Sequence, residues 1–143
     1  MLYTFGYSGL GKDGLRALLC PRGVDTIVDI RYSPNSRNSV WCGTWASNRT
    51  VEKAGLAYVH EKGLGNVLYR GAGIEIFNPA RVSVLFELLK QGKVPAIMCA
   101  CQAPDGCHRR VVANLAAGLW PGQEPLRIVD LPVTAEPTIS LGL

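Results

Sequence analysis

Three cysteines and two basic side chains lie close together near residue 100. Cys99, Cys101 and Cys107 fall within nine residues, and His108 and Arg109 follow the last of them directly. If a helix begins near Cys107, its N–H groups and its dipole favour a thiolate or a bound anion there. A neighbouring histidine can act as a base, and Arg109 can bind an oxyanion of the substrate. The catalytic residues that this spacing predicts are Cys99, Cys107 and His108.

The same cluster has two other interpretations. One is a zinc site formed by Cys99, Cys101, Cys107 and His108. Its spacing lacks the paired Cys-x2-Cys motifs of ordinary structural zinc sites. The other is that Cys99, at the end of an apolar segment, is simply a small core residue. No cofactor other than zinc is suggested by the sequence.

Polar residues also follow the other segments that favour β-structure. Gly6, Tyr7 and Ser8 end the first such segment, and the stretch from Asp29 to Arg37 follows the second. Arginine binds carboxylates and phosphates through its planar fork, so these loops suit an anionic ligand. An Asp–Arg pair that only braces its loop is the alternative for the second segment. The predicted substrate-binding residues are Gly6, Tyr7, Ser8, Asp29, Arg31, Ser33, Pro34, Arg37, His60 and Arg109.

Apolar and polar stretches alternate along the chain in a way that predicts strands separated by helices. This alternation is typical of a mostly parallel sheet with helices on both faces, in which ligands bind beyond the carboxyl ends of the strands. We therefore expect one three-layer α/β domain over residues 1–143, with a C-terminal tail from about residue 132. Strands are expected at 2–5, 26–30, 56–59, 94–100 and 126–131, and helices around 15–19, 44–54, 79–91 and 108–119.

The composition of the chain argues against a membrane protein and against an exported, disulfide-rich protein. The formal net charge is +4, and no apolar run approaches the roughly 18 residues that a membrane span needs. The five cysteines are an odd number, and the first residues lack the basic start of an export signal. We expect a cytoplasmic protein with reduced thiols, no membrane contact and an anionic small molecule or nucleic acid as partner. The sequence sets no oligomeric state.

Trp41 and Trp45, four residues apart, are expected on one packed helix face.

Several short motifs occur together along residues 4–115. They are Thr4-Phe5-Gly6-Tyr7-Ser8, Val28-Asp29-Ile30-Arg31 with Ser33-Pro34 and Ser36-Arg37, Tyr58-Val59-His60 with Leu64-Gly65, Met98-Cys99-Ala100, and Cys107-His108-Arg109. In this order and combination they resemble the family called domain of unknown function 488 (DUF 488). The resemblance implies a single α/β domain, and no activity is established for that family. The family usually has a glutamate where this chain has Cys101, so an activity that depends on that carboxylate would be altered here.

Two classes of function follow from these observations. The first is a small cysteine-dependent enzyme that acts on a phosphorylated or nucleic-acid-derived substrate, with His108 as base and Arg31 and Arg109 holding the anion. The second is a non-catalytic module that binds a nucleotide or nucleic acid while its thiols only pack. Rhodanese-like sulfur transfer is a further alternative, because an Asp-x-Arg strand end and a later strand–Cys–loop–helix share that layout.

Overall fold

The chain forms a five-stranded parallel sheet. The computed structural model describes residues 1–69, 71, 73–100 and 107–132, and the statements about structure concern these residues. The strand order is β3-β2-β4-β1-β5, and all neighbouring strands are parallel. The expected α/β architecture is therefore confirmed. The strands are β1 (Leu2–Gly6), β2 (Thr26–Asp29), β3 (Ala57–His60), β4 (Pro95–Cys99) and β5 (Ile128–Asp130).

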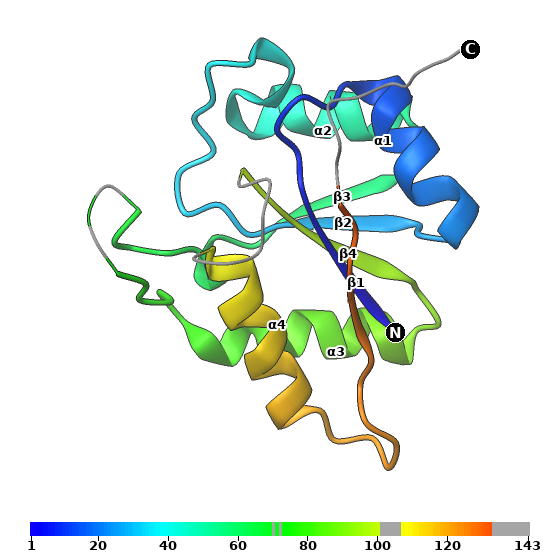
Figure 1. Cartoon of the computed structure of the whole chain (residues 1–143), viewed down its shortest axis with the longest axis vertical. Coiled ribbons are helices and arrows are strands. Elements are labelled where there is room, and N and C mark those ends of the chain that lie inside the picture. The colour runs from blue at the N-terminus through cyan, green and yellow to red at the C-terminus, as the bar shows by residue number, and fades with distance from the viewer. Residues whose placement is uncertain (70, 72, 101–106, 133–143) are drawn as a thin grey trace.

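Two helices cover each face of the sheet, as Figure 1 shows. The crossovers from β1 to β2 and from β2 to β3 run in one direction across the sheet, and those from β3 to β4 and from β4 to β5 run in the other. Because parallel crossovers are right-handed, reversing the direction moves the connecting helix to the opposite face. The helices α1 (Lys12–Leu19) and α2 (Gly43–Lys53) lie on one face, and α3 (Ser83–Lys90) and α4 (His108–Leu119) on the other.

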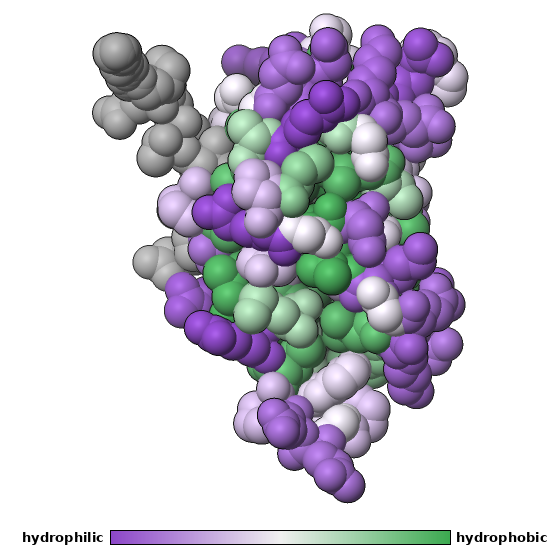
Figure 2. Space-filling view, turned by 90° about the vertical axis from the view of Figure 1, so that its right-hand side faces the viewer, coloured by the Kyte–Doolittle hydropathy of each residue, from purple (hydrophilic) through white to green (hydrophobic). Residues whose placement is uncertain are grey.

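Each face of the sheet has its own hydrophobic core, and the alternation along β4 shows how they are separated. Ala96 and Met98 belong to the cluster beneath α1 and α2, whereas Ile97 and Cys99 belong to the cluster beneath α3 and α4. Successive side chains of a strand point to opposite faces, so this pattern follows from the strand geometry. Figure 2 shows hydrophobic residues across the middle of one side of the molecule, between hydrophilic surfaces above and below. In the described part of the chain, no helix is long and apolar enough to cross a bilayer.

One local expectation was wrong. Trp41 ends a 3-10 turn (Ser39–Trp41) and is buried, whereas Trp45 on α2 is 74% exposed, with the Arg49 guanidinium 5.1 Å from its ring centre. The two tryptophans therefore do not share a packed helix face. Asn78 is followed by Pro79 and is the N-cap of the next element, although its side chain makes no capping hydrogen bond. A 3-10 turn (Pro79–Val82) intervenes before α3.

Candidate functional site

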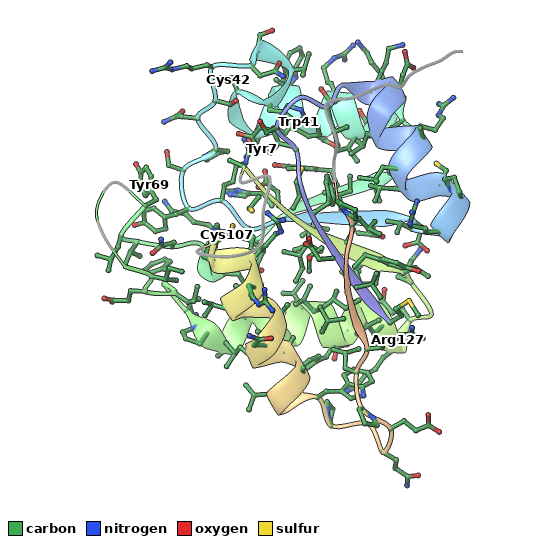
Figure 3. The ribbon with its side chains drawn as sticks, viewed as in Figure 1. Tyr7, Trp41, Cys42, Tyr69, Cys107 and Arg127 are labelled. Atoms are coloured by element: carbon green, nitrogen blue, oxygen red, sulfur yellow. The ribbon has the colours of Figure 1, made fainter. Side chains whose placement is uncertain are left out.

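A cavity of about 610 Å³ opens at the carboxyl ends of the strands. Figure 3 shows Tyr7, Tyr69 and Cys107 at this end of the molecule and Arg127 at the other. The cavity lies where the strand order changes direction, as expected for ligand sites in parallel α/β sheets. Its lining residues are Tyr7, Arg31, Tyr32, Ser33, Asn35, Asn66, Tyr69, Gly71, Gly73, Ile74, Ala100, Cys107 and His108.

Two cysteines lie together beside this cavity. Cys99 is the last residue of β4, and Cys107 precedes the first residue of α4. Their Sγ atoms are 2.9 Å apart, and both residues are present as thiols. Cys99 is completely buried, while Cys107 is 2% exposed and lines the cavity. They meet because Cys99 points to the face of the sheet that α4 covers.

Arg109 lies directly against these thiols. Its Nη1 donates to Cys99 Sγ at 3.2 Å and lies 3.9 Å from Cys107 Sγ. Its Nε donates at 3.1 Å to Oδ1 of Asp130, which also accepts a hydrogen bond from Thr4 Oγ1. Burial lowers the pKa of Arg109, but the hydrogen bonds and charges of Cys99 and Asp130 outweigh it and raise the pKa above its usual value. A buried, permanently charged guanidinium therefore stabilises negative charge at Cys99.

A second buried network occupies the other face of the sheet. Asp29 accepts two hydrogen bonds from the Arg31 guanidinium, at 2.8 Å from Nε and 2.6 Å from Nη2. Tyr58 donates to the same carboxylate at 2.6 Å. Burial, followed by the charge of Asp29 and this hydrogen bond, raises the pKa of the Tyr58 phenol, so the hydroxyl stays protonated. Asp29 has no exposed surface, and its charge is balanced entirely inside the protein.

The remaining donors of Arg31 fix the loop that follows β2. Nη1 donates to the Trp41 carbonyl at 2.7 Å and to the Tyr7 hydroxyl at 3.5 Å, and Nη2 donates to Ser47 Oγ at 2.8 Å. Together with the two bonds to Asp29, these contacts use all five N–H groups of the guanidinium. Arg31 lines the cavity wall, but it acts as a brace for the loop. This arrangement argues against the expectation that Arg31 holds a substrate anion.

The two histidines have different surroundings. His108 Nε2 lies 2.9 Å from the Ile30 carbonyl, and His60 Nε2 lies 2.9 Å from the Arg31 carbonyl. Because a carbonyl oxygen only accepts, Nε2 carries the proton in each neutral ring. Nδ1 of His108, which lines the cavity, is then the ring atom that can accept a proton. His60 does not line the cavity and instead ties the end of β3 to the loop after β2.

The structure brings some of the predicted site residues to the cavity and places others elsewhere. Tyr7, Arg31, Ser33, Cys107 and His108 line it. Cys99 and Arg109 lie immediately behind Cys107, with Arg109 completely buried, so Arg109 cannot clamp a ligand directly in this arrangement. The other predicted residues that do not line the cavity are Gly6, Ser8, Asp29, Pro34, Arg37 and His60.

An aromatic wall lines part of the cavity, and of its residues the sequence suggested only Tyr69, as an aromatic near arginines that could stack on a base. The Tyr32 ring packs edge-on against Phe77 at 5.4 Å and at a tilt against Tyr69 at 6.0 Å, measured between ring centres. Lys62 Nζ lies 4.7 Å from the centre of the same ring. In the sequence Tyr32 stands beside the predicted Arg31, and Tyr69 lies in a glycine-rich segment. Neither position carried a periodic signal that marks a binding wall.

Gly65 allows this wall to form, which gives a test of the local packing. A Cβ on Gly65 would lie 2.5 Å from Tyr32 Cα and 2.6 Å from its backbone nitrogen. Gly65→Ala should therefore lower the free energy of unfolding by about 1–3 kcal/mol, because backbone cannot give way as a side-chain end does. Gly118→Ala is the control: a Cβ there meets nothing within 4 Å, and alanine favours the helix by about 0.5–1 kcal/mol. Urea unfolding of both variants should give shifts of opposite sign.

The alternative interpretation of the cysteine cluster was a zinc site. Among the residues that the structure describes, no three His, Cys, Asp or Glu side chains converge in a way that could hold a metal ion. Cys101, one of the four ligands of that site, lies outside the described residues, as does the predicted tail from residue 133 onward.

No family model matches the chain, and no curated protein and no solved structure matches it either. Function is therefore inferred from the chemistry of the cavity.

Proposed function

We propose that this protein is an enzyme whose reaction passes through a covalent bond at Cys107 Sγ, with an anionic small molecule held in the cavity. The observation that carries the proposal is the position of this thiol, which lines the cavity of about 610 Å³ and touches a second sulfur that Arg109 contacts. A thiol that only fills a core has no need of a buried cation beside it. We also propose, from the motifs, that the chain belongs to the DUF 488 family.

Positive charge lies close to the sulfur of Cys107. The nucleophile is the thiolate, and Cys107 stands at the positive end of α4, a helix of 12 residues. The guanidinium of Arg109 adds a positive charge 3.9 Å from Cys107 Sγ. His108 follows in sequence and lines the same cavity, so its Nδ1 is placed to accept or return a proton. These three features supply what covalent catalysis by cysteine requires.

The lining of the cavity supports an anionic substrate. Its described residues include no aspartate or glutamate, so nothing among them repels negative charge. Hydroxyl groups of Tyr7 and Ser33 and the amide of Asn35 offer hydrogen bonds, and Asn35 Nδ2 already donates to Ser33 Oγ at 3.0 Å. The rings of Tyr32 and Tyr69 provide an apolar wall against which a flat part of the substrate can pack.

Alkylation with two reagents of different charge tests this proposal. A thiolate attacks the CH2 carbon of iodoacetate or iodoacetamide in the same way and displaces iodide. Iodoacetate carries a negative charge, whereas iodoacetamide carries none. We expect both to modify Cys107 in the folded protein at neutral pH, with the rates measured by peptide mass spectrometry. The ratio of the iodoacetate rate to the iodoacetamide rate should be about fivefold higher at Cys107 than at Cys42, as about 1 kcal/mol of favourable charge interaction implies.

The matched control lies in the same chain, because Cys42 is exposed and, like Cys107, stands before a helix. Among the described residues, no arginine contacts its sulfur. Cys107→Ser should abolish labelling at position 107 and leave the rates at Cys20 and Cys42 unchanged. If Cys107 is alkylated only after denaturation, the thiol is a core residue and the proposal is wrong.

A further inference from the structure

The thiol of Cys99, which lies behind Cys107, has no role in the reaction proposed so far. Covalent catalysis at Cys107 requires one sulfur, whereas the structure places Cys99 Sγ 2.9 Å from it. Cys99 is completely buried and does not line the cavity, so it cannot attack a substrate there directly. Among the described residues, the sulfur within its reach is that of Cys107. What Cys99 can do therefore depends on what Cys107 carries.

The kind of adduct decides whether Cys99 can react. In a thioester, a phosphorylated cysteine or a thioether, the electrophilic atom belongs to the substrate, and attack on Cys107 Sγ displaces nothing useful. In a mixed disulfide, Cys107 Sγ is itself electrophilic, and a neighbouring thiolate displaces the substrate sulfur. A second thiol in contact with the nucleophile is thus useful for sulfur chemistry and idle in acyl or phosphoryl transfer.

We propose that Cys99 and Cys107 form a dithiol couple that reduces disulfides of anionic thiols. This inference rests on the proposed function, because it uses Cys107 as the nucleophile of the same cavity. The Cys107 thiolate attacks the substrate R–S–S–R, which forms a Cys107–S–S–R bond and releases one RS⁻. The Cys99 thiolate then attacks Cys107 Sγ, which forms the Cys99–Cys107 disulfide and releases the second RS⁻. The protein loses two electrons, and the substrate disulfide gains them.

Two features of the site suit the second step. Arg109 Nη1 contacts Cys99 Sγ at 3.2 Å and so favours the Cys99 thiolate that has to attack. Closing the gap from 2.9 Å to a disulfide bond of about 2.05 Å moves each sulfur by less than 1 Å. Asp130 and Thr4 hold Arg109 from the other side. A low-molecular-weight thiol returns the couple to the dithiol by the reverse exchange and is itself oxidised to a disulfide.

The test uses the full chain with Cys20, Cys42 and Cys101 replaced by serine, so that only Cys99 and Cys107 remain. The reduced protein is mixed with 3,3′-dithiodipropionate, an anionic disulfide, then quenched in acid and alkylated for intact-mass analysis. We expect this chain to lose both thiols and retain no adduct. Addition of Cys99→Ser should stop the reaction at one mercaptopropionate on Cys107, and addition of Cys107→Ser should leave Cys99 unmodified.

The arms of the experiment separate the two proposals. A stable mercaptopropionate adduct on Cys107 with Cys99 still reduced would overturn the dithiol couple and leave the nucleophile in place. If the disulfide does not react although iodoacetate alkylates Cys107 rapidly, the dithiol couple would again be overturned and the nucleophile would stay in place. Failure of both reactions would overturn both proposals. If Cys99→Ser does not fold, Cys99→Ala replaces it, since either residue removes the resolving sulfur.

Charge selectivity provides a readout that proximity of two thiols alone would not give. Cystamine is a disulfide of similar length that carries positive ends. For each disulfide, the rate of reaction with the two-cysteine chain is divided by the rate of reaction of the same disulfide with a small free thiol. This ratio should be about fivefold higher for 3,3′-dithiodipropionate than for cystamine. Equal ratios would show that the cavity does not select anionic disulfides and would overturn the substrate class.

Discussion

Replacement of Asp29 by alanine should lower the free energy of unfolding by about 3–5 kcal/mol, the cost of leaving a buried charge without its partner. Asp29 is completely buried and accepts hydrogen bonds from both Nε and Nη2 of Arg31. Without the carboxylate, the guanidinium keeps a positive charge in the interior and cannot give up its proton. Urea unfolding followed by circular dichroism measures the loss.

Two further variants show whether the unpaired charge is the cause. Tyr58→Phe removes one hydrogen bond to Asp29 and leaves both charges, so it should cost about 1.5–3 kcal/mol. Replacing both partners, as in Asp29→Leu with Arg31→Met, removes both charges together and should be less destabilising than the sum of the two single changes. An Asp29→Ala variant no less stable than Tyr58→Phe would refute this explanation.

Trp41→Ala should destabilise the protein by about 3–5 kcal/mol, which is typical of deleting a large buried aromatic side chain. Trp41 is completely buried, its ring stacks on Tyr7 with 5.1 Å between ring centres, and its Nε1 donates to the Leu10 carbonyl at 2.8 Å. Its own carbonyl accepts from Arg31 Nη1. The residue therefore joins the hydrophobic core to the brace behind the cavity. Thermal and urea unfolding measure the change.

The effect of this substitution should reach the cavity through Tyr7. Tyr7 lines the cavity, and its backbone N–H donates to the Cys99 carbonyl at 2.9 Å. Trp41→Phe keeps a stacked ring but loses the indole N–H, so it should cost clearly less than Trp41→Ala. Trp45→Ala is the matched control, because that side chain is 74% exposed, and its cost should stay within about 0.5 kcal/mol. Equal losses at positions 41 and 45 would contradict the packing described.

Much of the fold could be predicted from local patterns. Thr26, Ile27 and Val28 are β-branched, which suits β2 because this strand is buried between β3 and β4. The helix α4 begins and ends where its sequence pattern predicts. The placement of the loops at one edge also follows from the alternation of strands and helices. Trp41 and Trp45 were misassigned, because a 3-10 turn and a helix with similar spacing cannot be distinguished by two aromatic residues.

The residue types near Cys107 determined that thiols and a histidine stand together, and the alternation of elements determined the edge at which they lie. Only the tertiary structure decided which side chains face the cavity. Arg31 and Arg109 both suggest anion binding in the sequence, yet their donors are directed to Asp29, Trp41, Ser47, Cys99 and Asp130. Most of these acceptors lie far from the arginines along the chain, and only folding brings them within hydrogen-bond distance. The physical reason is that a hydrogen bond depends on distances and directions in space, which a local sequence pattern does not specify.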